Sequence, residues 1–109
     1  MNKYKNKKTV LDGFIFDSKK EAHHYSTLKT WEKQGKISGL KCQVKFEIVP
    51  KSGNNKRAHY YIADFTYTTS TGEKIIDDVK SPATKKNAVY RLKKALVLSL
   101  YPDWTFIES

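Results

Sequence analysis

Two carboxylates and a lysine stand in a short, otherwise apolar stretch, residues 74–80, which reads KIIDDVK. Its isoleucines and valine favour a β-strand. Asp64 ends a similar apolar run, YIAD, and the triplet STG between the two runs fits a three-residue hairpin loop with glycine in the left-handed position. In the register that this loop sets, Asp64 lies directly opposite Asp78, with both carboxylates on one side of the sheet. A loop of another length would shift that register.

Directly opposed like charges destabilise a pair of strands. At about 5 Å and an effective dielectric constant of about 20, the repulsion between Asp64 and Asp78 amounts to roughly 3 kcal/mol. Lys80 lies on the same face as Asp78, because side chains alternate along a strand, and it supplies a counter-charge. A divalent cation supplies a better one, since carboxylate oxygens and free water positions are what Mg²⁺ prefers. The alternative is an acidic pair left exposed at a frayed strand end.

A third carboxylate, Glu21, belongs to a predicted helix. Ser18 and Glu21 have the spacing of a capping box, so a helix is expected to begin at Ser18 and to end near Gly35. Apolar residues recur through it at helical spacing: Ala22, Tyr25, Leu28 and, at the end of the stripe, Trp31. This spacing puts Glu21 on the flank that faces the sheet, where it can cap the helix and still reach the two aspartates. The alternative is a purely capping role.

The remaining elements follow from periodicity and from chain-breaking residues. Alternation over residues 42–48, and a second apolar run over residues 60–67, predict two strands before the one at 74–80. Residues 84–101 predict a second helix, which Pro102 stops, and residues 104–107 predict a final short strand. The apolar stripe expected in that helix is Ala88, Leu92, Ala95, Leu96 and Ser99. The predicted order is α-β-β-β-α-β, an α/β fold with a mixed sheet flanked by helices.

Composition limits the class of protein. The 109 residues suit one domain, with a basic N-terminal arm over about residues 1–8, and the net charge is +10. Such a charge favours a polyanionic partner, and nucleic acid is favoured over a membrane surface, because no basic amphipathic helix stands apart from the core pattern. The alternative is a lysine-rich solvated surface. With one cysteine, Cys42, and no apolar run of membrane-spanning length, the expected location is the reducing cytoplasm.

Other reactive side chains have simpler interpretations. His23 and His24 are adjacent, so they lie on different faces of the helix and are interpreted as surface residues. His59 points away from Asp64 and is interpreted as structural. Cys42 belongs to an apolar alternation and is interpreted as a buried thiol. Three strand tyrosines are interpreted as packing residues, with stacking on unpaired bases as the alternative: Tyr60, Tyr61 and Tyr67.

The order of Glu21 on a first helix, Asp64 in YIAD, and Asp78-Val79-Lys80 in DDVK resembles the PD-(D/E)XK nuclease superfamily. Within it the chain is similar to small phage-encoded nucleases related to Holliday junction resolvases, and to transposase-associated nucleases. The resemblance covers nearly the whole chain, although the D-x-K triplet alone is common. Two positions depart from the pattern. Ala63 stands where the family often has proline, and Asp78 where it often has glutamate.

The resemblance implies a restriction-endonuclease-like core and a magnesium site, with Mn²⁺ as a substitute. Asp64, Asp78 and the Val79 carbonyl would hold the ion, and Glu21 would complete its shell. Lys80 would orient the attacking water and stabilise the charge that develops. Two neighbouring residues are assigned separately: Gln43 is expected to support the site, with an exposed strand glutamine as the alternative, and Asp77 is expected on the opposite face, outside the site.

The implied activity is Mg²⁺-dependent endonucleolytic hydrolysis of DNA, with branched DNA such as Holliday junctions as substrate, in phage replication or recombination. The location would then be the host cytoplasm. The residues expected to contact phosphates are Lys7, Lys8, Lys19, Lys20, Lys85, Lys86, Lys93 and Lys94. A homodimer is expected, because so small a protein cannot enclose two strands of a junction. The alternatives are a non-catalytic basic DNA-binding protein and a nuclease subunit that is active only beside a partner.

Overall fold

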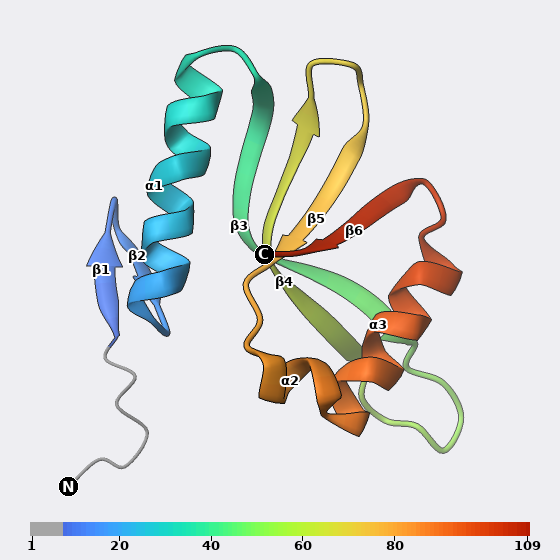
Figure 1. Cartoon of the computed structure of the whole chain (residues 1–109). Coiled ribbons are helices and arrows are strands. Elements are labelled where there is room, and N and C mark those ends of the chain that lie inside the picture. Colours follow the sequence, from blue (N-terminus) through green and yellow to red (C-terminus); the bar gives the residue numbers. More distant parts are fainter. Residues whose placement is uncertain (1–7) are drawn as a thin grey trace, which may run out of the picture.

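A mixed four-stranded sheet organises the chain, and helices pack against it (Figure 1). The computed structural model describes residues 8–109. The sheet has the order β3-β4-β5-β6, with antiparallel pairing from β3 to β5 and parallel pairing of β5 with β6. Its strands are β3 (Ile37–Val49), β4 (His59–Thr69), β5 (Lys74–Asp78) and β6 (Trp104–Glu108). The predicted α/β class is confirmed.

Helix α1 (Lys19–Lys33) begins where the sequence predicts. The side chain of Ser18 accepts a hydrogen bond from the Glu21 N–H at 3.1 Å, which satisfies one of the free donors of the first turn. The buried side of α1 forms an apolar cluster with the sheet and the preceding strand. Its members are Phe16, Ala22, Tyr25, Leu28, Ile37, Phe65, Tyr67 and Ile75. This cluster fixes the start of α1, and with it Glu21, relative to the sheet.

A short hairpin precedes α1 and is missing from the predicted order. Strands β1 (Thr9–Leu11) and β2 (Phe14–Phe16) pair across Asp12 and Gly13, whose φ angles are 51° and 81°. Asp-Gly between apolar residues is a strong signal for such a tight turn, and the sequence contains it. Of the predicted N-terminal arm, Lys8 is exposed, and residues 1–7 lie outside the described part of the chain.

The predicted helix over residues 84–101 is wrong in two respects. It is divided into α2 (Pro82–Lys86) and α3 (Ala88–Leu100), because Asn87 is extended and its side chain caps α3 by accepting from the Tyr90 N–H. The buried residues of α3 are Tyr90 and Val97, whereas Leu92, on the predicted stripe, is 63% exposed. Apolar residues occur around the whole helix, so their spacing does not select the buried side.

The ribbon of β3 and β4 changes its covering layer half-way along. Ala63 packs in a second apolar cluster under α3, whereas Phe65, two residues further along β4, packs under α1. Between them Asp64 lies across from Gln43, which has a φ of 54°. In Figure 1, β3 and β4 accordingly change direction near the middle of each strand. The second cluster contains Phe46, Ile48, Tyr61, Ala63, Ile76, Tyr90 and Val97.

The hairpin of β4 and β5 has the register that the three-residue loop predicts. Tyr67 pairs with Ile75 and Phe65 pairs with Asp77, and Gly72 has a φ of 92°. One further step along this register places Asp64 beside Asp78, where β5 ends. The bend at Asp64 and the end of β5 therefore meet at the same place.

Candidate active site

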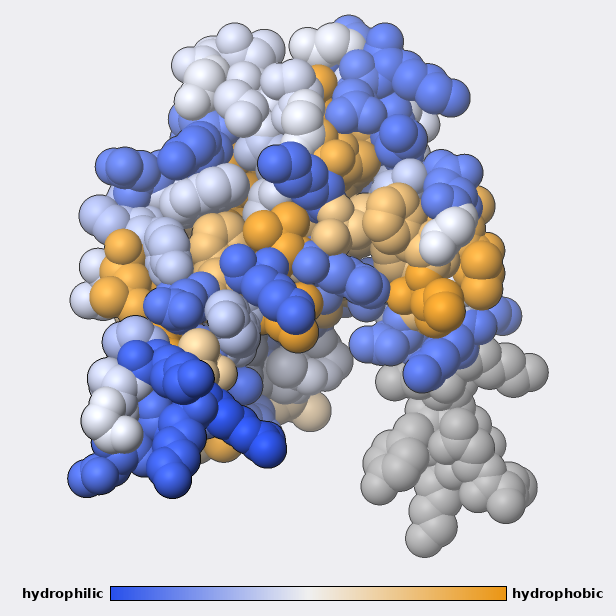
Figure 2. Space-filling view, turned by 180° about the vertical axis from the view of Figure 1, so that it is seen from behind, coloured by the Kyte–Doolittle hydropathy of each residue, from blue (hydrophilic) through white to orange (hydrophobic). Residues whose placement is uncertain are grey.

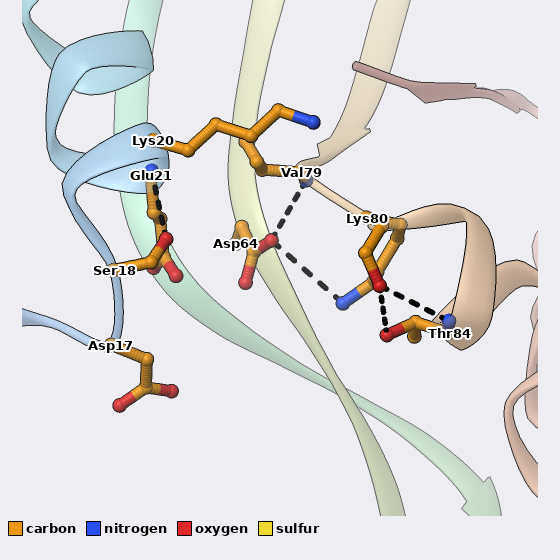
Figure 3. Close-up of a pocket in the computed structure, with 9 residues that line it drawn as sticks. Asp17, Ser18, Lys20, Glu21, Asp64, Val79, Lys80 and Thr84 are labelled. Atoms are coloured by element: carbon orange, nitrogen blue, oxygen red, sulfur yellow. Dashed lines mark hydrogen bonds and ion pairs between the residues drawn. The ribbon is translucent and has the colours of Figure 1, made fainter. Parts of the chain in front are cut away.

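A cleft of about 350 Å³ opens between the start of α1 and the segment that follows β5. Figure 3 shows Asp64 in the middle, Glu21 and Ser18 on the α1 side, and Lys80 extending toward Asp64 from the other side. The residues that line the cleft are Asp17, Ser18, Lys20, Glu21, Asp64, Val79, Lys80, Ser81 and Thr84. Three of the four predicted catalytic residues, Glu21, Asp64 and Lys80, thus face one opening, and the fourth, Asp78, is buried and bonded to the backbone of Asp64.

Asp64 and Asp78 are held by reciprocal hydrogen bonds across the two strands. The Asp64 N–H donates to Oδ1 of Asp78 at 2.7 Å, and the Val79 N–H donates to Oδ2 of Asp64 at 2.9 Å. Asp78 is 0% exposed, and burial raises the pKa of both carboxyls, although the charge of Lys80 acts in the opposite direction. The fold therefore fixes two carboxylates in a place that penalises their charge.

Of the basic side chains in the described part of the chain, Lys80 is the one that forms ion pairs with these two carboxylates. Its Nζ lies 3.8 Å from Oδ2 of Asp64 and 3.9 Å from Oδ2 of Asp78, with a largely buried side chain. Both distances exceed that of a hydrogen bond, so the ammonium compensates charge while its N–H groups are not committed to either carboxylate. An ammonium in this position can stabilise negative charge that develops in the cleft.

Tyr90 supports Lys80 from α3 and was not identified from the sequence. The Lys80 Nζ lies 5.5 Å from the centre of the Tyr90 ring, within the range of a cation–π contact. The Tyr90 hydroxyl donates to Glu108, whose carboxylate lies 3.4 Å from the Lys94 Nζ. Burial and the bond to Glu108 raise the pKa of Tyr90, so its hydroxyl stays protonated. No local pattern around Tyr90 indicates this role, because the contact depends on how α3 packs.

Glu21 forms the α1 side of the cleft and is buried. Burial, followed by the negative charges of Asp64 and Asp17, raises its pKa to about 7. A carboxyl that titrates near neutrality in a cleft is a frequent property of functional sites. The negative charges of Asp64 and Asp17 that contribute to this shift would also attract a cation placed in the cleft.

The donor groups fit a hard divalent cation in part. Oδ2 of Asp78 is buried and has no hydrogen-bond partner among the residues that the structure describes, which is unusual for a carboxylate oxygen and leaves it available to a cation. Within residues 8–109, however, no three His, Cys, Asp or Glu side chains are gathered closely enough to hold a metal ion. The structure thus brings Asp64 and Asp78 together, while Glu21 remains across the cleft. The predicted three-carboxylate ligand set is not assembled.

Gln43 does not line the cleft. Its side-chain amide donates to the Ile15 carbonyl of β2 at 3.1 Å, so it ties the ribbon of β3 and β4 to the N-terminal hairpin. Its predicted supporting role is therefore at most indirect, through the bend opposite Asp64.

Asp77 lies outside the site, as predicted, and forms a buried polar cluster on the α1 side. Its carboxylate accepts from Tyr67 at 2.8 Å and from Ser109 at 2.6 Å, and lies 2.9 Å from His24 Nε2. Burial acts to raise its pKa, but the bonds from His24, Ser109 and Tyr67 outweigh burial and hold the pKa below its usual value. The prediction that His24 is a surface residue is wrong, because its side chain is largely buried against Asp77. The sequence did not indicate this contact, since the two residues are 53 positions apart. His23 is exposed, as predicted.

The predicted phosphate-binding lysines are distributed unevenly around the cleft. Lys20 lines it, and Lys85 lies beside Lys94 in a second depression next to α3. The exposed members of the set are Lys8, Lys19, Lys20, Lys85 and Lys86, whereas Lys93 and Lys94 are half-buried. Lys7 lies outside the described residues.

Two further candidates have no catalytic environment. Cys42 is half-buried against the α1 cluster, and burial raises the pKa of its thiol to about 11, so it is not a nucleophile at neutral pH. His59 is the first residue of β4 and is exposed rather than part of a core.

Comparison with protein families matches residues 1–107 to the model of a family described as a protein of unknown function, DUF1064. The chain belongs to the DUF1064 family. No curated protein and no solved structure matches this DUF1064 chain. Across the described residues, none of its helices combines the length and apolar character needed to cross a bilayer.

Proposed function

We propose that this chain is a metal-dependent DNA endonuclease that hydrolyses phosphodiesters, with branched DNA as its substrate. The observation that carries the proposal is the Lys80 ammonium, held within 4 Å of both Asp64 and Asp78 at the inner end of a cleft. Keeping two buried carboxylates with raised pKa values beside one ammonium reduces the stability of the fold. Such a cost is typical of groups that have a function.

The roles follow from position. Asp64 and Asp78, with the Val79 carbonyl, would hold a Mg²⁺ or Mn²⁺ ion, and Glu21 would face it across the cleft. When bound, such an ion polarises the scissile phosphate and supplies a water of lowered pKa. Lys80 donates hydrogen bonds to the attacking water and to the phosphoryl oxygens as their charge increases. Lys20, on the rim, contacts the neighbouring phosphate.

The net charge of +10 supports a DNA substrate. Paired cuts in a branched substrate require two active sites, so we include a two-fold homodimer in the proposal. Lysine predominates over arginine, with only Arg57 and Arg91 among the basic residues carrying a guanidinium group. Lysine binds phosphates as a point charge, so recognition is expected to depend on the backbone and shape of the DNA more than on its bases.

The proposal is tested by incubating the protein with labelled four-way junction, linear duplex and single-stranded DNA, with Mg²⁺ or with chelator. Metal-dependent cutting of the junction is expected, and Asp78→Ala and Lys80→Ala should abolish cutting while junction binding persists. Asp103→Ala, an exposed acidic position between α3 and β6, is the matched control and should cut normally. Junction binding without cutting in any condition would contradict an autonomous nuclease.

Two observations support alternatives that the same experiment separates. The lack of a three-residue metal cluster among residues 8–109 favours a non-catalytic DNA-binding protein, which would bind the junction and never cut it. The outer side of α3 exposes Val89, Leu92 and Leu100, a surface that a partner protein could cover, so a nuclease subunit active only beside its partner is the other alternative.

A further inference from the structure

Within residues 8–109, nothing packs over one side of the lower half of the ribbon of β3 and β4. Tyr61 and Ala63 pack under α3, and the alternate residues Tyr60 and Ile62 point to the other side, where they are 42% and 52% exposed. Asp64, two residues beyond Ile62 on the same strand, lines the cleft. The uncovered side, which we call the outer face and define by Lys45, Tyr60 and Ile62, therefore adjoins the cleft along β4.

Positive charge lies on the outer face and at one end of it. Lys45 pairs with Ile62 across the ribbon, and its Nζ lies 5.7 Å from the centre of the Tyr60 ring. Glu47, which pairs with Tyr60, is the acidic residue of this half of β3. At the far end, residues 50–58 read PKSGNNKRA, with three basic and no acidic residues. Figure 2, which views the molecule from behind, shows hydrophilic residues gathered at the end where this connection lies.

We propose that the outer face binds an unpaired DNA strand, with a base stacked on Tyr60 and phosphates on Lys45, Lys56 and Arg57. An exposed aromatic ring beside cations is the arrangement that binds single strands without sequence preference. A protein partner fits less well, because the cores of protein interfaces are depleted of lysine. This inference rests on the proposed function for the identity of the nucleic acid, and it specifies the substrate as DNA with a single-stranded segment beside the scissile phosphate.

The spacing sets where the unpaired segment lies. Asp64 lies four residue steps along β4 from Tyr60, which corresponds to about 13 Å. At about 3.4 Å per stacked nucleotide, the base on Tyr60 lies roughly four nucleotides from the phosphate in the cleft. Duplex DNA cannot present a base face at that distance, so a tail, flap or open branch point is required.

The test is fluorescence anisotropy in chelator, so that binding is measured without cleavage. The probes are a labelled duplex with a single-stranded tail of ten nucleotides and a blunt duplex of the same length. Tyr60→Leu should weaken binding of the tailed probe about tenfold, as the loss of one stacked base requires. Tyr60→Phe keeps the ring and should bind within twofold of the natural protein, and blunt duplex binding should be the same for all variants.

Leu92→Ala, at an exposed apolar residue on α3, is the matched control and should bind both probes normally. Equal binding of the tailed probe by Tyr60→Leu and Tyr60→Phe would overturn the inference. A loss of blunt-duplex binding in Tyr60→Leu as large as its loss on the tailed probe would overturn it too. Because no cutting is measured, selective loss on the tailed probe supports the outer face even if the chain proves not to be a nuclease. Conversely, if the outer face does not bind the single-stranded tail, the proposal that the cleft residues cut DNA is unaffected.

Discussion

The Asp64 N–H donates to Oδ1 of Asp78 at 2.7 Å, so the backbone of one acidic residue binds the side chain of the other, 14 positions further along the chain. The return bond comes from Val79 to Asp64 at 2.9 Å. These two bonds hold the carboxylates in place by the strand pairing itself. The pair is therefore pre-organised before any cation or substrate binds.

Replacing Asp78 by asparagine should increase stability and remove cleavage. The amide oxygen of asparagine can still accept the hydrogen bond from the Asp64 N–H. The buried carboxylate charge, which is unfavourable because burial raises the pKa of Asp78, is removed. In chelator at pH 7 the free energy of unfolding is expected to rise by about 1 kcal/mol. Urea unfolding followed by tryptophan fluorescence measures this, with Asp103→Asn as the exposed control. A loss of stability in Asp78→Asn would show that the ionised carboxylate supports the fold.

Stability should fall as pH rises from 5 to 7. The folded state holds the Glu21 proton up to about pH 7, whereas the unfolded state releases it near 4.5, so the unfolded state binds fewer protons across this window. Asp64 and Asp78, with raised pKa values, act in the same direction. Asp77, whose pKa is lowered, stabilises the folded state when it is ionised. This stabilisation is lost only below about pH 4, outside the window from pH 5 to pH 7.

The free energy of unfolding in chelator should therefore decrease by roughly 2 kcal/mol between pH 5 and pH 7 because of Glu21. Glu21→Gln should flatten this slope, and urea titrations at pH 5, 6, 7 and 8 compare the two proteins. An identical slope in both would mean that Glu21 titrates normally in the folded state.

Tyr90 should position the Lys80 ammonium. Tyr90→Leu removes the ring under the Lys80 Nζ, whereas Tyr90→Phe removes only the hydroxyl bond to Glu108. Cleavage by the Leu variant is expected to fall about tenfold in kcat, with KM unchanged, and the Phe variant should stay near the natural rate. NMR supplies a second readout, because the ring shifts the Lys80 ε-methylene protons upfield in the natural and Phe proteins. Equal kcat values in the Leu and Phe variants would exclude this positioning role.

The cluster around Asp77 should matter for stability and not for cleavage. His24→Ala leaves the buried carboxylate with two hydrogen-bond donors instead of three, and should lower the free energy of unfolding by about 2 kcal/mol. Tyr67→Phe should lower it by about 1 kcal/mol. Thermal unfolding and cleavage per folded molecule are the two measurements. A loss of cleavage in folded His24→Ala would instead include this cluster in the site.

Local signals in the sequence predict the part of the site that depends on neighbouring residues. Ser18 marks the start of α1, and Gly72 sets the hairpin register that brings Asp64 to Asp78. The turn at Asp12 and Gly13 was equally readable, and its hairpin could have been predicted.

The remaining features depend on packing between distant segments. Which side of α3 is buried cannot be read from its sequence, because apolar residues are spread around the helix and between its basic residues, so the contact of Tyr90 with Lys80 was not predictable. The bond of His24 to Asp77 joins residues 53 positions apart. The bend of the ribbon at Gln43 and Asp64 accompanies the packing of its two halves against different helices, which the periodicity of the sequence does not record.

Calorimetric titration of the protein with Mn²⁺ tests the central claim most directly, because the claim is that the Asp64 and Asp78 carboxylates are held for a cation. Saturable uptake of Mn²⁺ by the natural protein is expected. The Asp64→Asn and Asp78→Asn variants should lose this uptake, and the control variant Asp103→Asn should retain it. No uptake by the natural protein, or equal uptake by all four proteins, would contradict a metal-dependent site in this cleft.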